Sequence, residues 1–270
     1  MQPLKQLCDV RDSVFDPSTK STVLDLTDLI ENRINPNHFF ETNYVTNGMK
    51  TLLREAFDRF SRRTQQGIFL LSQSMGGGKT HNMLALGLLA QHPKFREEVL
   101  QSHHDPNLGR VRVAAFTGRE SDAPLGVWGA IAEQIGKREQ FSDYYSPLSP
   151  PGQSAWVELL KGEPLLILLD ELPPYFEAAR AHEIGNADLA TVTNTALSNL
   201  FSAVNRPELE NVCVVISDLT ATYGEGSQQI GKALENLENE AGRTAMQLEP
   251  VQHNTPEIYH ILRKQLFESL

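Results

Sequence analysis

The sequence contains few cysteines and few basic residues, and both shortages narrow what the protein can be. Its 270 residues include two cysteines, Cys8 and Cys213, which are far apart and offer neither a disulfide framework nor a zinc site. Aspartate and glutamate number 34 against 24 lysines and arginines, so the formal net charge is -10. This charge repels a phosphate backbone, and we interpret Arg59, Arg62 and Arg63 as a solvated helix face. Direct DNA binding by this segment is therefore not expected.

Long apolar runs are also missing. No stretch approaches the roughly 18 apolar residues of a membrane span, and the N-terminus MQPLKQLCDVRDSVF lacks the organisation of a signal peptide. The cysteine usage fits a reducing compartment. We therefore expect a cytoplasmic protein without membrane contact. Its composition, 40% hydrophobic and 21% charged, is that of a globular chain able to bury a core.

Short apolar runs alternate with helix-like stretches along the chain. The runs are Ile68–Leu71, Val111–Phe116, Leu165–Leu169, Val212–Ile216 and, more weakly, Ala245–Leu248. Such runs are typical of strands buried on both faces, and their alternation with helices indicates a parallel sheet covered by helices. The expected helices are at about 79–90, 124–138, 152–161, 188–205, 226–242 and 256–269. The sequence therefore predicts an α/β fold.

The remaining segments are assigned by their composition. Residues 1–47 are expected to form an irregular leader, followed by a helix from about Met49 to Arg62. Residues 139–154, dense in proline and serine, and residues 181–188 are expected to be surface loops. The chain stops at Leu270, in an expected helix just past the fifth strand, and we interpret it as a fragment of a longer protein.

A glycine-rich stretch follows the first apolar run. The phosphate-loop pattern G-x-x-x-x-G-K-[ST] matches Gly78, Lys79 and Thr80, but Gln73 stands where its first glycine belongs. A strand before and a helix after are the context that the motif requires; the alternative is a flexible turn that caps a buried strand. Lys79 would reach the β- and γ-phosphates of ATP, and the Thr80 hydroxyl would ligate Mg²⁺. The expected nucleotide-binding residues are Ser74, Met75, Gly76, Gly77, Gly78, Lys79, Thr80 and His81.

Acidic and polar residues end the third and fourth runs. In PLLILLDEL, Asp170 would hold Mg²⁺ and Glu171 would polarise the attacking water. In NVCVVISDL, Ser217 or Asp218 would position that water or sense the γ-phosphate. Ligands bind beyond the carboxyl ends of strands in open parallel sheets, so these groups should face the glycine loop. The alternatives are solvated acids for the first pair and a strand exit or helix cap for the second.

Three further residues, two arginines and a histidine, are considered as candidate site residues. Arg243, in ENEAGRTAMQLEP, has the planar charged fork that completes a phosphoryl-transfer site in trans, although a surface salt bridge is equally compatible. Arg263, in IYHILRKQLF, is expected to decorate a helix face. His81 has no second metal-type residue at ligand spacing, so we expect it to pack or to form a hydrogen bond near the site.

Taken in chain order, these features resemble an AAA+ ATPase of the additional-strand class. The resemblance implies a three-layer sandwich with a central five-stranded parallel sheet in the order 5-1-4-3-2, where the Ser217 strand lies between the Lys79 and Asp170 strands. It implies that Arg243 is an arginine finger and that ATP is hydrolysed in a homo-oligomeric ring or stack. A lid domain would follow the fifth strand, and at most its first helix is present here.

Four segments carry a narrower resemblance. They are HFFETNYVTNGMKTLL, MGGGKTHNMLAL, DELPPYF and EPVQHNTPEIYHILRKQLF. They are similar to the N-terminal region of large prokaryotic ATPases classified as a domain of unknown function and encoded in phage-defence islands. This resemblance implies defence-system protein partners and an adenine contact from Asn43–Met49. It divides the chain into a leader at 1–47, an ATPase core at 48–254 and the start of a lid or downstream region at 255–270.

We therefore expect a magnesium-dependent ATPase that binds ATP and ADP. A nucleotide-gated scaffold with little turnover is the alternative from a different class. A small-molecule kinase is a third reading, but the sequence shows no obvious substrate lid, and Glu171 next to the metal acid favours water as the nucleophile.

Overall fold

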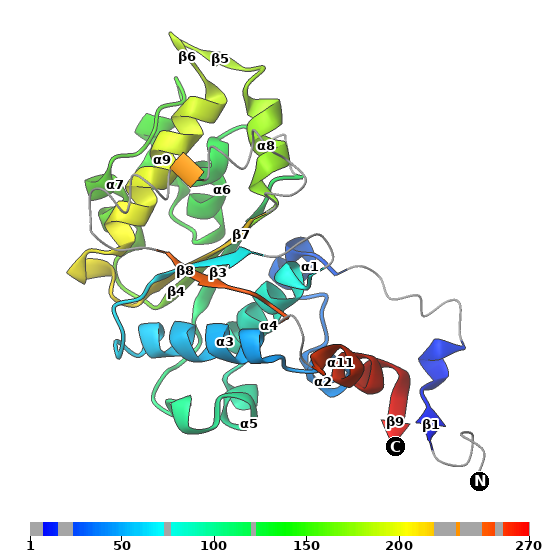
Figure 1. Cartoon of the computed structure of the whole chain (residues 1–270). Coiled ribbons are helices and arrows are strands. Elements are labelled where there is room, and N and C mark those ends of the chain that lie inside the picture. The colour runs from blue at the N-terminus through cyan, green and yellow to red at the C-terminus, as the bar shows by residue number, and fades with distance from the viewer. Residues whose placement is uncertain are drawn as a thin grey trace.

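A five-stranded parallel sheet forms the centre of the protein (Figure 1). The structure is a computed structural model and describes residues 8–15, 24–72, 77–119, 123–218, 231–232, 245–251 and 256–269. The strands of the sheet are β2 (Ile68–Ser72), β3 (Arg112–Thr117), β4 (Leu165–Asp170), β7 (Val212–Asp218) and β8 (Met246–Leu248). The five predicted strands are thus present, and each differs from its predicted bounds by at most two residues.

The strands lie in the order β8-β2-β7-β4-β3 from one edge of the sheet to the other. The labels β1, β5, β6 and β9 belong to short strands outside this sheet. If only the five strands of the central sheet are numbered along the chain, their spatial order is 5-1-4-3-2. β7 therefore lies between β2, which precedes the glycine loop, and β4, which ends in Asp170. Leu71 is level with Ser217, and Leu169 is level with Ile216. The carboxyl ends of β2, β7 and β4 consequently lie side by side at one end of the sheet.

Helices cover both faces of the sheet, which makes three layers (Figure 1). One face is covered by α6 (Gly126–Gln134), α7 (Gln153–Leu160), α8 (Leu172–Ala179) and α9 (Leu189–Val204). The other is covered by α1 (Leu26–Ile30), α3 (Asn47–Phe60), α4 (Lys79–Gln91) and α5 (Arg96–Leu100). Side chains alternate between the two cores along β2, β3, β4 and β7: Ile68 and Leu70 enter the first, and Phe69 and Leu71 the second. The prediction of strands buried on both faces is confirmed for these four strands, whereas β8 packs Met246 and Leu248 on the second core and leaves Gln247 exposed.

Residues 1–47 were predicted to form an irregular leader, but part of this leader is helical. It contains α1 and α2 (Pro36–Thr42), of five and seven residues. Asp25 and Asp28 form a capping box at α1, and Asn35 caps α2 in front of a proline. Leu29 and Phe39 are buried against the core. The prediction failed here because helices this short show too few turns for apolar periodicity to appear.

The two predicted loops are partly ordered. Residues 139–154 include most of a 3₁₀ helix, Arg138–Tyr144, whose Phe141 is fully buried. Residues 181–188 include a small exposed hairpin, β5 (Glu183–Ile184) with β6 (Ala187–Asp188), which protrudes from the molecule (Figure 1). Of the predicted helix 226–242, all but 231–232 lies outside the described residues.

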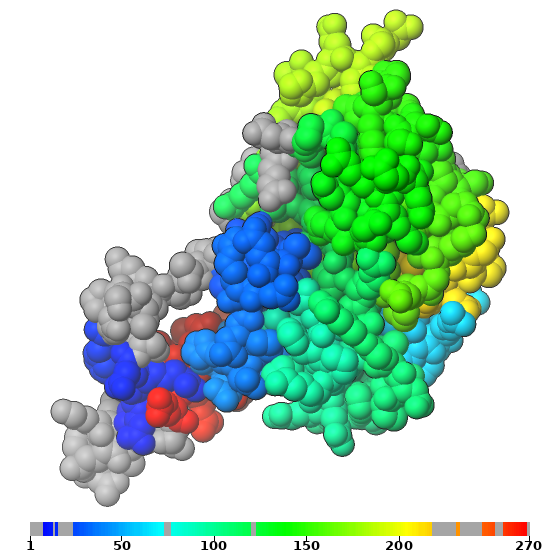
Figure 2. Space-filling view, turned by 180° about the vertical axis from the view of Figure 1, so that it is seen from behind, coloured from blue at the N-terminus to red at the C-terminus, as the bar shows by residue number. Residues whose placement is uncertain are grey.

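The end of the chain returns to the leader. α11 (Glu257–Leu266) ends three residues before the predicted helix does, and β9 (Phe267–Ser269) follows. β9 pairs antiparallel with β1 (Asp9–Val10). Figure 2 shows the dark blue leader residues against the red residues at the end of the chain. None of the helices in the described part of the chain has both the length and the apolar character needed to span a bilayer.

Arg59 corrects the interpretation of the arginine cluster at the end of α3. Its side chain is buried, at 2% exposure, whereas Arg62 is exposed and forms an ion pair with Glu210. The Arg59 guanidinium donates to four main-chain carbonyl oxygens, those of Gln65, Val204, Leu209 and Val212, at 2.6 to 3.0 Å. Arg59 therefore joins α3 to the chain before β2 and to the segment that leads into β7, and it is not part of a solvated face.

Candidate functional site

The two residues predicted to hold magnesium are in direct contact. Thr80, the second residue of α4, donates a hydrogen bond from Oγ1 to Oδ2 of Asp170 over 2.6 Å. Asp170 is the last residue of β4 and is only 4% exposed. A hydroxyl and a carboxylate are hard oxygen ligands of the kind that Mg²⁺ prefers. The side chains present thus fit a magnesium ion, because one such cation could be bound by both oxygens.

Ser217 holds the other oxygen of the same carboxylate. Its Oγ, fully buried at the end of β7, donates to Oδ1 of Asp170. The backbone N–H of Glu171 donates to Oδ1 of Asp170 over 3.0 Å and approaches Oγ of Ser217 at 3.1 Å. Asp218 is described through its backbone, which is level with Ser72 of β2. Ser217 therefore contacts the site directly, while the role expected of Asp218 stays a prediction.

The start of α4 has the geometry of a phosphate-binding turn. Gly78, the residue before the helix, has a φ of +82°, in the left-handed region that favours glycine. The N-cap residue is a glycine and supplies no side-chain cap, and the amides of a helix start point toward the site that an anion would occupy. Lys79 is the first helical residue and is 6% exposed. Half-buried Gly77 precedes it, whereas Ser74, Met75 and Gly76 lie outside the described residues.

His81 packs against the leader. Its ring stacks on Phe39 of α2, with centroids 4.7 Å apart and planes 23° apart. Burial lowers the pKa of His81 to about 4, so the ring is uncharged at neutral pH. The positive charge at this helix start is therefore that of Lys79, and His81 joins α4 to α2.

The structure adds Arg119, which the sequence analysis missed. Arg119 lies just beyond β3, and its guanidinium binds both carboxylate oxygens of Glu171, with Nη2 to Oε1 at 3.0 Å and Nε to Oε2. Its side chain is 75% exposed, against 24% for Glu171. The reasoning that identified Asp170 and Ser217 at strand ends, applied to the end of β3, would have found Arg119 as well.

Gly118 allows this ion pair to form. A Cβ on Gly118 would lie 1.8 Å from the carbonyl oxygen of Glu171, so no larger residue fits between the two strand ends. The Gly118 N–H donates to the carbonyl oxygen of Asp170 over 2.8 Å. This close approach brings the next residue, Arg119, within reach of the Glu171 carboxylate.

The segment Asn43–Met49 docks onto the chain beyond β8. The Thr46 hydroxyl donates to the carbonyl oxygen of Pro250, and the N–H of Asn47 donates to the carboxylate of Glu257 over 2.6 Å. Glu257 is buried at the start of α11. The leader is thereby attached to both the fifth strand and the final helix, while its expected contact with adenine stays a prediction.

Arg243 lies outside the described residues, so its role as an arginine finger stays a prediction. The other proposed catalytic groups, Lys79, Glu171 and Ser217, all lie at the carboxyl end of the sheet or at the start of α4. The site therefore combines a helix start, a lysine, two oxygens suited to a cation and an acid held by an arginine.

Comparison with known proteins gives one family. The chain matches the family model described as the DUF499 N-terminal domain over residues 2–112 and 120–243. The matched segments include Lys79, Asp170 and Ser217, and Arg119 falls in the short gap between them. No curated protein matches the chain. Because the family model covers most of its length, the chain belongs to the DUF499 N-terminal domain family.

Proposed function

We propose that this protein binds ATP with magnesium and hydrolyses it at the carboxyl end of the sheet. The observation behind the proposal is the 2.6 Å contact between Oγ1 of Thr80 and Oδ2 of Asp170, beside the helix start that carries Lys79. In P-loop NTPases the hydroxyl residue after the loop lysine and an acid at a neighbouring strand end hold the magnesium ion together. The placement of Thr80 and Asp170 supports the same roles for these two residues.

Each residue of the site has a task in this proposal. Lys79 and the first amides of α4 bind the phosphate oxygens, and Thr80 and Asp170 hold Mg²⁺. The ion, when bound, neutralises negative charge on the β- and γ-phosphates. Glu171 accepts a hydrogen bond from the attacking water and orients it. Ser217 keeps the Asp170 carboxylate turned toward Thr80.

Replacing Lys79 with Ala tests the phosphate site. The substitution is expected to weaken ATP binding at least about tenfold, because charge-assisted hydrogen bonds are worth roughly 1.5 to 3 kcal/mol. Equilibrium titration with labelled ATP in the presence of Mg²⁺ measures the effect. Lys161→Ala is the control, since Lys161 is exposed and pairs with Glu158 away from the site. Unchanged ATP binding by a folded Lys79→Ala variant would refute the proposed site.

A second function, a nucleotide-gated switch with little turnover, is favoured by the Arg119–Glu171 ion pair. A carboxylate bound at both oxygens by an arginine is not free to orient water. In this reading, Arg119 restrains Glu171 until a partner or a second ligand displaces it. The ATPase and the switch then differ in how often the pair opens.

Replacing Arg119 with Ala tests the proposed restraint of Glu171. Release of Glu171 is expected to raise steady-state phosphate release roughly two- to fivefold, the range for a partly exposed ion pair. Arg138→Ala, which removes an exposed arginine paired with Glu133, is the matched control and should change nothing. A fall in turnover would instead mean that Arg119 assists the reaction, and the restraint would have to be abandoned.

Self-assembly and a defence role complete the proposal. The resemblance to AAA+ ATPases assigns Arg243 to the site of a neighbouring copy and implies a homo-oligomer. The phage-defence context of the narrower resemblance implies further protein partners. Both statements rest on family resemblance and on no described contact.

A further inference from the structure

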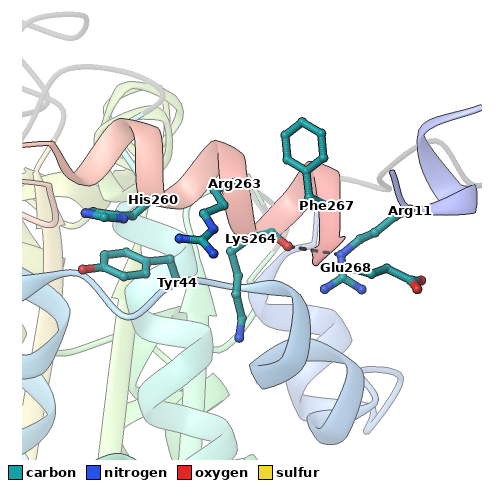
Figure 3. A pocket seen from close by; sticks show the side chains of 7 residues that line it. All are labelled: Arg11, Tyr44, His260, Arg263, Lys264, Phe267 and Glu268. Carbon is teal, nitrogen blue, oxygen red and sulfur yellow. Dashed lines mark hydrogen bonds between the residues drawn. The ribbon is translucent and has the colours of Figure 1, made fainter. Parts of the chain in front are cut away.

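A cavity of about 330 Å³ lies where the end of the chain meets the leader (Figure 3). α11 and β9 supply one wall through residues such as Arg263 and Lys264, and the leader supplies Arg11 and Tyr44. None of the residues lining it belongs to the Thr80–Asp170 site. It is therefore a separate place in the fold, with its own chemistry.

The cavity is strongly cationic for a protein of net charge -10. Arg11, Arg263 and Lys264 contribute three positive charges against one carboxylate, that of Glu268. Nε of Arg11 donates to the carbonyl oxygen of Lys264 over 3.2 Å, and this hydrogen bond connects the leader to α11. Within the described ranges, none of the three cations forms an ion pair with a carboxylate. Their mutual repulsion would be relieved by a bound anion.

An aromatic pair lies beside these cations. The rings of Tyr44 and His260 stack, with centroids 5.2 Å apart and planes 24° apart. Figure 3 shows Arg263 next to this pair, with Arg11 and Glu268 toward the other side of the cavity. A planar aromatic surface close to guanidinium groups suits a ligand that has both a flat ring and a negative charge.

We propose that this cavity binds a nucleoside monophosphate unit. Its phosphate would be held by Arg11, Arg263 and Lys264, because the guanidinium fork matches phosphate geometry. Its base would lie against the Tyr44–His260 pair. The cavity volume is at the lower end of the range for small-ligand sites, which fits one such unit and not a larger ligand. The unit is either a free nucleotide or one nucleotide of a single strand, since both present the same chemistry.

The cationic cavity was not expected from the sequence. The net charge argued against nucleic-acid binding, and Arg263 was expected only to decorate a helix face. Arg263 instead lines the same cavity as Arg11, 252 positions earlier in the chain, because β9 pairs with β1. Overall charge averages over the surface and cannot show that a few cations gather in one cavity.

The test uses the 270-residue chain carrying Lys79→Ala, so that the proposed ATP site contributes less to nucleotide binding. Calorimetric titrations with AMP, with inorganic phosphate and with a 5′-phosphorylated thymidine octamer are run at low and at physiological salt. AMP is expected to bind about ten times more tightly than phosphate, because a base stacks on an aromatic ring. AMP affinity should also fall as salt rises.

Two cavity variants and one control variant assign any binding to the cavity. Arg11→Gln with Arg263→Gln is expected to weaken AMP binding at least tenfold. Lys161→Gln with Arg206→Gln removes the same charge from exposed positions elsewhere and should leave it unchanged. Tyr44→Leu should abolish the preference for AMP over phosphate while retaining phosphate binding. Thermal unfolding checks that each variant is folded.

The possible results separate the ligand sources and the two proposals. Strand binding that AMP displaces identifies a nucleic-acid strand, and AMP binding without strand binding identifies a free nucleotide. Equal AMP affinity in the Arg11–Arg263 variant, equal affinity for AMP and phosphate, or no binding at low salt would overturn the proposal. If Lys79→Ala leaves ATP binding intact, the proposed ATPase site is refuted. The Arg11–Arg263 variant still tests independently whether AMP binds in the cavity.

Discussion

Replacing Glu171 with Gln is expected to lower ATP turnover at least about 100-fold, the smallest contribution usual for a general base. The amide keeps the shape of the side chain but cannot accept a proton from water. ATP binding should change less than about twofold, because the groups proposed to bind phosphate and magnesium do not include this carboxylate. The backbone N–H of Glu171, which supports Asp170, is unaffected by the substitution. Steady-state phosphate release and labelled-ATP titration measure the two quantities.

Glu177→Gln is the matched control for this experiment. Glu177 is exposed on α8, six residues beyond Glu171, so the same chemical change there should leave turnover unaltered. Phosphate release is measured at several protein concentrations, because hydrolysis completed by a neighbouring copy increases with concentration. Unchanged turnover in a folded Glu171→Gln variant would remove this residue from the mechanism. Turnover too low to measure in the unsubstituted protein at every concentration would favour the nucleotide-gated switch.

The sheet and the central contact of the site follow from local features of the sequence. Apolar runs such as Leu165–Leu169 are long enough for a strand and too short for most helices, so both their type and their burial could be predicted. Parallel strands place all their carboxyl ends at one end of the sheet. Thr80 and Asp170, 90 positions apart, were therefore expected to meet, and they do.

Other features depend on tertiary contacts that leave no local trace. Arg119 stands at a strand end, where the same reasoning could have found it, but its pairing with Glu171 depends on the close approach of Gly118. Arg11 and Arg263 line one cavity because a two-residue strand pairs with β9. A strand that short has no detectable alternation of polar and apolar residues. Sequence reasoning of this kind therefore finds the motif residues and misses those that restrain or surround them.

Replacing Arg59 with Leu is expected to lower the free energy of unfolding by about 3 to 5 kcal/mol. The guanidinium satisfies three buried carbonyl oxygens around the start of β7 and a partly buried one on the chain before β2. Leucine fills part of the volume but donates no hydrogen bond, and each buried acceptor left without a partner costs roughly 1 to 3 kcal/mol. Chemical denaturation followed by circular dichroism measures the loss. The site should keep its ATP affinity under conditions where the variant is folded, since Arg59 lies at the opposite end of the sheet.

Arg62→Leu supplies the control from the same helix end, and Arg59→Lys shows which property of the arginine matters. Arg62 is exposed and pairs with Glu210 at the surface, so its loss should change stability by no more than about 0.5 kcal/mol. Lysine at position 59 keeps the charge but lacks the planar fork, so it can satisfy only some of the carbonyl oxygens and should give an intermediate loss. If all three variants were equally stable, solvent would have to reach those carbonyl oxygens, and Arg59 would not hold α3 against β7.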